Sequence, residues 1–90
     1  MYKIELSSKV TKFLKKRTPK EQTRLIEIFE ILQENPYDND LQIKPLKGTT
    51  SNSFRLRFKK YRIIYEVIDD ELLIYLIDAD SRGDIYKKGS

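Results

Sequence analysis

The chain has 90 residues, of which 39% are hydrophobic and 36% charged, and its formal net charge is +4. This length fits one domain with a small core. Because cysteine and histidine are both absent, we exclude disulfides, thiolate nucleophiles, zinc–cysteine sites and a histidine general base. No apolar run approaches the roughly 18 residues of a membrane-spanning helix, and the N-terminus does not resemble a signal peptide, so we expect a cytoplasmic protein.

The first predicted elements are a short strand and a helix. Polar and apolar residues alternate over Tyr2–Leu6, which predicts a strand. Ser7 or Ser8 can cap a helix that continues to about Arg17. Its apolar side consists of three residues at helical spacing, namely Val10, Phe13 and Leu14.

A second helix is predicted with sharper boundaries. Thr18 suits the N-cap, Pro19 the first helical position and Glu21 the third, which together form a capping box. The helix should end at about Glu34, because Pro36 cannot continue it. Four apolar residues at positions i, i+3, i+4 and i+7 predict its buried face: Leu25, Ile28, Phe29 and Leu32.

The second half of the chain is predicted to form strands. We expect Tyr37–Asn52 to be mostly loop, followed by strands over Phe54–Phe58, Tyr61–Ile68 and Leu72–Ile77. The last of these is apolar at every position, which predicts burial on both faces. The order β-α-α-β-β-β indicates a single α+β domain over residues 1–88, with two helices on one face of a mainly antiparallel sheet. We interpret the final Gly-Ser pair as a cloning scar.

The segment Ser53–Arg62 contains five basic residues and no acid. If Lys59–Lys60 is a hairpin tip, one face of the hairpin is apolar and the other carries Arg57 opposite Arg62, with Arg55 one pleat away. Like charges directly opposite on a sheet are destabilising, so this arrangement indicates a site for an anion such as a nucleic-acid backbone. The expected register pairs Phe58 with Tyr61, Arg57 with Arg62, Leu56 with Ile63 and Phe54 with Tyr65.

Four stretches together resemble the RelE/ParE family of toxins from toxin–antitoxin systems, and most closely its RelE-like branch. They are Lys44–Gly48, Phe54–Arg57, Tyr61–Val67 and Ser81–Tyr86. In that family an L-K-G turn precedes a Y-R-x-R strand, then Y-R-x-x-Y, and an R-x-x-x-Y signature lies near the end. The motifs occur here in the same order and the expected fold covers the whole chain.

The resemblance implies a small toxin that a RelB-like antitoxin, encoded beside it, holds inactive in a hetero-oligomer. RelE-like toxins cleave mRNA in the ribosomal A site. Their reaction needs no metal or other cofactor, because the 2′-hydroxyl attacks the adjacent phosphate. The expected partners are therefore the antitoxin, the ribosome and mRNA, with no membrane.

The resemblance also assigns roles to individual residues. Arg62 falls where RelE-like toxins hold the scissile phosphate, and Arg82 where an arginine stabilises the transition state or leaving group. Tyr86 falls on the tyrosine that orients the nucleotide. We further expect RNA contacts from five basic residues: Arg55, Arg57, Lys59, Lys60 and Lys47.

The general base is left open. Ser81 stands where many relatives carry histidine, and a guanidinium does not deprotonate near neutrality. Glu66 lies in phase with Arg62 on the same strand and is a candidate, as is Tyr86 if arginines lower its pKa. Electrostatic stabilisation of the pentavalent phosphate without a base is the third option.

Two alternatives compete with this interpretation. One is a ParE-like toxin that inhibits DNA gyrase, and another is an inactive toxin fold retained for antitoxin binding.

The basic residues of the first helix suit its solvated side better than a contact with ribosomal RNA. The acids Asp78, Asp80 and Asp84 lack the glycine turn and distal glutamate of a calcium loop, so we expect no metal site. The basic residues of that helix are Lys9, Lys12, Lys15, Lys16 and Arg17.

Overall fold

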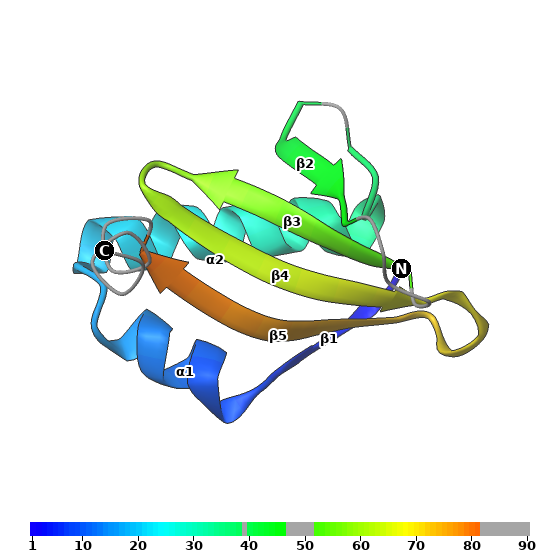
Figure 1. The fold of residues 1–90 in the computed structure, drawn as a ribbon, viewed down its shortest axis with the longest axis horizontal. Coiled ribbons are helices and arrows are strands. Elements are labelled where there is room, and N and C mark those ends of the chain that lie inside the picture. The colour runs from blue at the N-terminus through cyan, green and yellow to red at the C-terminus, as the bar shows by residue number, and fades with distance from the viewer. Residues whose placement is uncertain (39, 47–51, 82–90) are drawn as a thin grey trace.

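The computed structural model describes residues 1–38, 40–46 and 52–81, the last without its side chain. Within these residues, two helices pack on a five-stranded sheet of order β1-β5-β4-β3-β2, as Figure 1 shows. Strand β1 is parallel to β5, and all other neighbours are antiparallel. The elements are β1 (Lys3–Leu6), α1 (Ser8–Lys15), α2 (Pro19–Glu34), β2 (Gln42–Pro45), β3 (Ser53–Phe58), β4 (Tyr61–Ile68), a 3-10 turn (Asp69–Glu71) and β5 (Leu73–Ser81).

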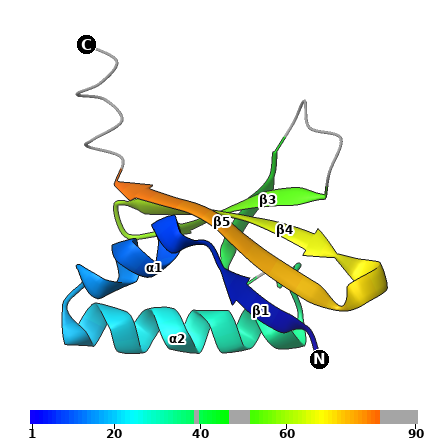
Figure 2. The same ribbon diagram turned by 90° about the horizontal axis from the view of Figure 1, so that it is seen from below.

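Both helices lie on one side of the sheet and leave its other face open, as Figure 2 shows. The core fills the space between these layers, so the predicted α+β class is confirmed. The helix side chains predicted to be buried are indeed buried, except Leu14, which is half-buried. Among the described residues, the buried apolar ones are Val10, Phe13, Leu25, Ile28, Phe29, Leu32, Leu56, Phe58, Tyr61, Ile63, Tyr65, Val67, Ile74, Leu76 and Ala79.

The predicted helix starts are confirmed by their capping contacts. The Ser7 hydroxyl accepts a hydrogen bond from the backbone N–H of Val10 at 3.2 Å. The Thr18 hydroxyl accepts one from the backbone N–H of Glu21 at 3.2 Å, and the Glu21 carboxylate accepts one from the N–H of Thr18 at 3.4 Å. These side chains satisfy donors that the first helical turn leaves unpaired.

The predicted hairpin register is also confirmed. Arg57 pairs with Arg62 and Phe54 with Tyr65, with the two other predicted pairs between and beyond them. Lys59 has a φ of 54°, a left-handed conformation that lets a two-residue turn reverse the chain. The inward aromatic pairs stack, with ring centroids 5.6 Å apart for Phe54–Tyr65.

The structure adds a strand to one prediction and corrects another. The segment Tyr37–Asn52, predicted to be mostly loop, also contains the edge strand β2, in which Gln42–Pro45 pairs with β3. So short a strand, ending in proline, has no apolar alternation of its own and depends on its neighbour for pairing. Burial of Leu72–Ile77 on both faces is wrong, since Leu72 is 51% and Ile77 36% exposed. Leu72 caps the 3-10 turn in a left-handed conformation and precedes the strand.

Candidate functional site

The candidate site lies on the face of the sheet that the helices leave open. Alternation along β3 points Leu56 and Phe58 into the core, so Arg55 and Arg57 face the other way. On β4 the same alternation places Arg62 on the open face beside Arg57, its partner in the ladder. Arg57 is exposed, while Arg55 and Arg62 are half-buried. The structure therefore brings the three predicted arginines together.

A fourth residue joins this group from β5. Asp80 is the ladder partner of Arg62, so a row of paired residues crosses four strands as Gln42, Arg57, Arg62 and Asp80. Directly paired side chains have Cβ atoms about 5 Å apart. Arg62 thus lies between a like charge and an opposite one.

A β-bulge is what brings Asp80 to this face. Ile64 pairs with Asp78 but the next residue, Tyr65, pairs with Leu76, so Ile77 is an extra residue in β5. Ile74 and Leu76 are buried in the core, and uninterrupted alternation would have sent Asp78 and Asp80 to the same side. The extra residue reverses the phase, leaving Ala79 inside and both carboxylates outside. Sequence reasoning missed this because nothing in the chain marks the bulge.

The arginines are available to a ligand. Among the described residues, the side chains of Arg55, Arg57 and Arg62 make no hydrogen bond or ion pair. Beside them, a groove of about 250 Å³ opens over β2 and β3. Guanidinium groups bind phosphate oxygens through two parallel hydrogen bonds, so the face can hold an anion. The groove is lined by Leu41, Gln42, Ile43, Lys44, Arg55 and Arg57.

The two lysines of the hairpin tip are partly engaged within the molecule. The Lys59 ammonium lies 3.9 Å from the Glu21 carboxylate and 5.5 Å from the centre of the Phe58 ring. The Lys60 ammonium lies 5.7 Å from the centre of the Tyr61 ring. Both side chains are exposed, so these weak contacts leave them accessible at the end of the sheet.

Glu66 is not brought beside Arg62. Four residues of strand separate their Cα atoms by about 13 Å, and the ladder partners of Glu66 are Ser53 and Tyr75. Its role as a base stays a prediction. Several predicted site residues lie outside the described part of the chain, namely Lys47, Arg82, Tyr86 and the side chain of Ser81.

Among the described residues, two tyrosines have shifted pKa values, and both make structural contacts. Burial raises the pKa of Tyr65, whose hydroxyl donates to the Pro36 carbonyl at 2.7 Å. The hydroxyl of Tyr2 donates to the Asp69 carboxylate at 2.6 Å, and this hydrogen bond raises the pKa of Tyr2 to about 12. Both phenols are therefore held in the protonated form, which cannot act as a base.

The described residues offer neither a cluster of metal ligands nor a membrane-spanning helix. No group of three acidic side chains comes together in a way that could hold a metal ion within residues 1–38, 40–46 and 52–81. In the same ranges, neither helix is both long and apolar enough to cross a membrane.

Comparison with known proteins gives consistent relatives. The family described as "ParE toxin of type II toxin-antitoxin system, parDE" matches residues 4–86. A Methanocaldococcus jannaschii protein named "Putative toxin RelE1" is 31% identical over 87 residues, or 96% of each chain. The archaeal RelE–RelB complex from Pyrococcus horikoshii OT3 contains a chain with a TM-score of 0.81 and 26% identity, covering 91% of this chain and 96% of that one. A chain of the RelB–RelE antitoxin–toxin complex from Methanococcus jannaschii has a TM-score of 0.72 and 30% identity, covering 90% of this chain and 93% of that one.

Proposed function

Because this chain belongs to the RelE/ParE family of toxins from type II toxin–antitoxin systems, we propose that it is a ribosome-dependent endoribonuclease. It would cleave mRNA in the ribosomal A site, without a metal ion, in the cytoplasm. The observation that carries the proposal is the open sheet face, where Arg55, Arg57 and Arg62 converge without partners among the described residues. Keeping Arg57 opposite Arg62 costs stability, which a bound phosphate would offset.

In the proposed reaction, the 2′-hydroxyl of one nucleotide attacks the phosphorus of its own 3′-phosphate. The new P–O2′ bond forms as the bond to the 5′-oxygen of the next nucleotide breaks. The 2′-hydroxyl loses a proton, the departing 5′-oxygen gains one, and a 2′,3′-cyclic phosphate remains. Arg62 would stabilise the charge that builds on the pentavalent phosphate, an effect worth about 10²–10³ in rate for one preorganised donor.

The remaining roles follow from the family resemblance. Arg82 would stabilise the transition state or the leaving oxygen, and Tyr86 would orient the nucleotide. The distance along β4 between Arg62 and Glu66 favours Tyr86, or electrostatic stabilisation alone, over Glu66 as the source of base catalysis. Arg55, Arg57, Lys59, Lys60 and Lys47 would bind the RNA backbone.

We also propose a RelB-like antitoxin as the resident partner. The support is that two of the similar solved structures are complexes of a RelE chain with RelB. The partner would neutralise the arginine face or displace the C-terminal segment that carries Tyr86. The first route would prevent RNA from reaching Arg62, and the second would prevent Tyr86 from reaching the substrate.

The second candidate function is inhibition of DNA gyrase, which the description of the matching family as a ParE toxin favours. An inactive toxin fold that only binds antitoxin is the third. Inducing the chain without antitoxin separates the three. We expect pulse-labelled protein synthesis to fall before DNA synthesis, with cleavage sites mapping to translated mRNA. DNA synthesis falling first would indicate gyrase, and unchanged growth would indicate an inactive fold.

A further inference from the structure

A second groove, of about 270 Å³, lies between α1 and the end of β5. Lys9, Lys12 and Lys16 are spaced by three and four residues, so they share one side of the helix. All three are exposed, whereas the apolar side chains of the groove, Phe13 and Ala79, are buried. The surface offered to a ligand is therefore cationic. The lining residues are Lys9, Lys12, Phe13, Lys16, Arg17, Ala79 and Asp80.

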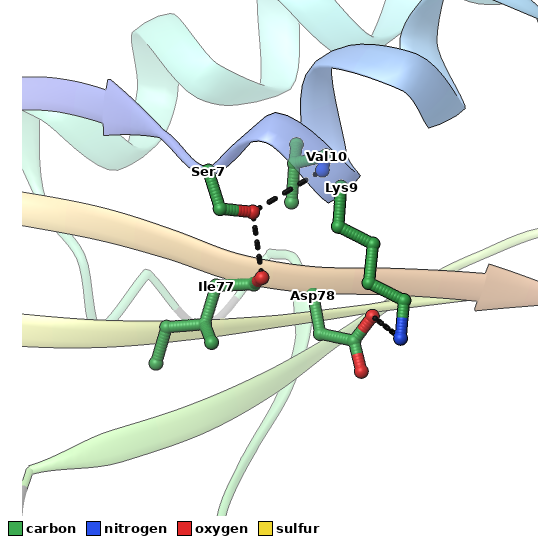
Figure 3. Close-up of polar contacts among 5 residues, drawn as sticks. All are labelled: Ser7, Lys9, Val10, Ile77 and Asp78. Atoms are coloured by element: carbon green, nitrogen blue, oxygen red, sulfur yellow. Dashed lines mark hydrogen bonds and ion pairs between the residues drawn. The ribbon is translucent and has the colours of Figure 1, made fainter.

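The groove has a fixed frame at its first end. The Ser7 hydroxyl that caps α1 also donates to the carbonyl oxygen of Ile77, the extra residue of the bulge, at 2.7 Å. Two residues further, the Lys9 ammonium lies 3.1 Å from the Asp78 carboxylate. Figure 3 shows both contacts, which tie the start of the helix to the strand.

Its other end is fixed by stacking. The Arg17 guanidinium lies 4.5 Å from the centre of the Phe13 ring and 4.4 Å from that of Tyr61, a core residue of β4. The Nε of Arg17 also donates to the Phe13 carbonyl at 3.2 Å. Lys12 and Lys16 lie between these two anchored ends, and neither side chain has an ion pair with any of the described residues. Both ammonium groups are therefore free to bind an anion, and the helix that carries them is anchored to the sheet at both ends.

The groove continues the arginine face. Asp80 belongs to its lining and is at the same time the ladder partner of Arg62. Adjacent strands are about 5 Å apart, so an RNA strand that crosses the sheet from Arg57 over Arg62 reaches the groove next. An RNA backbone carries one negative charge per nucleotide, and along this track it would meet the cations Arg57 and Arg62, pass the carboxylate of Asp80 and then reach the lysines of the groove.

We propose that Lys12 and Lys16 bind RNA phosphates next to the phosphate held by Arg62, making the α1 groove a second RNA-backbone site. This rests on the proposed ribonuclease function. RNA fits better than an acidic protein segment, because a protein partner would need apolar anchors and the exposed lining offers only charge. It also assigns a role to helix lysines that the sequence favoured as a solvated surface.

The test compares two variants of equal charge. One is Lys12→Gln with Lys16→Gln, and the control is Lys15→Gln with Lys20→Gln, whose positions are exposed and outside this groove. Glutamine keeps a helix propensity close to that of lysine, and thermal unfolding checks that both fold. Affinity is measured for a short 2′-O-methyl RNA, which cannot undergo the proposed cleavage, across a potassium chloride series.

Each phosphate contact with single-stranded RNA contributes about 0.7 to the slope of log affinity against log salt. We expect the groove variant to lose about 1.4 from that slope, and the control to keep the wild-type slope. Equal slopes for the two variants would overturn the proposal, as would a groove variant that loses antitoxin but not RNA affinity. Cleavage of translated mRNA is scored separately, so a wild-type chain with the expected slopes but no cleavage would refute only the ribonuclease function.

Discussion

Replacing Arg62 by alanine tests whether this arginine contributes to cleavage or to the stability of the fold. On the open face Arg62 lies between Arg57, a like charge, and Asp80, an opposite charge. Each directly opposed pair changes stability by about 0.2–1 kcal/mol, with opposite signs. The two terms nearly cancel, so Arg62→Ala should change the free energy of unfolding by less than about 1 kcal/mol. Arg57→Ala removes only the repulsion, because its other neighbour, Gln42, is neutral. It should therefore be the more stable of the two variants.

Cleavage should respond quite differently. Loss of one preorganised donor at the phosphate should reduce the rate by about 10²–10³, or about 2.7–4 kcal/mol of transition-state stabilisation. Arg62→Lys is the matched control, since it keeps the charge but loses the two-pronged contact with phosphate.

The assay has two parts. Urea unfolding followed by circular dichroism gives stability for both alanine variants and their double variant, whose coupling should have the sign of a repulsive pair. Primer extension on mRNA in a translating extract gives cleavage rates. Wild-type cleavage by Arg62→Ala would refute the assignment of the phosphate to this residue. A loss of more than about 2 kcal/mol of stability would show that Arg62 is primarily structural.

Three further predictions concern Asp80, Tyr65 and the antitoxin. Asp80→Asn should strengthen binding of the blocked RNA, because the carboxylate of Asp80, the ladder neighbour of Arg62, places a negative charge beside the proposed phosphate site; unchanged or weaker binding, measured by fluorescence anisotropy, would contradict this electrostatic effect. Tyr65→Phe should destabilise the fold by about 1–3 kcal/mol in denaturant titrations at neutral pH, since it leaves the Pro36 carbonyl unpaired in the core. Because the pKa of Tyr65 is raised in the folded state, the unfolded chain loses the Tyr65 proton first, above about pH 10. The wild type should therefore lose stability above that pH, and the difference in unfolding free energy between wild type and Tyr65→Phe should narrow. Antitoxin affinity should fall less steeply with salt than ribosome affinity, because exposed apolar residues such as Leu72 and Ile77 can share the contact; equal slopes would indicate purely ionic neutralisation.

Local chemistry in the sequence was enough for the helices and the central hairpin. The Thr18 capping box and Pro36 set the ends of α2 without help from the rest of the chain, because caps and proline act through neighbouring backbone groups. The two-residue tip at Lys59 fixes the register of β3 and β4, since a tight turn leaves one pairing available. The convergence of Arg55, Arg57 and Arg62 followed directly from that register.

Pairings between distant segments could not be derived this way. Strand β2 forms because β3 offers a free edge to Gln42–Pro45, whose own sequence carries no strand pattern. The parallel pairing of β1 with β5 joins segments about seventy residues apart, and no local signal specifies it.

The final composition of the site was decided by the bulge. Alternation in the sequence, taken by itself, assigned Arg55, Arg57 and Arg62 to one face, because side chains on a strand repeat every two residues. Only in the folded sheet does Ile77 loop out of the ladder, where its carbonyl accepts a hydrogen bond from the Ser7 cap of α1. That extra residue reverses the direction of the Asp78, Ala79 and Asp80 side chains, and so places Asp80 beside Arg62.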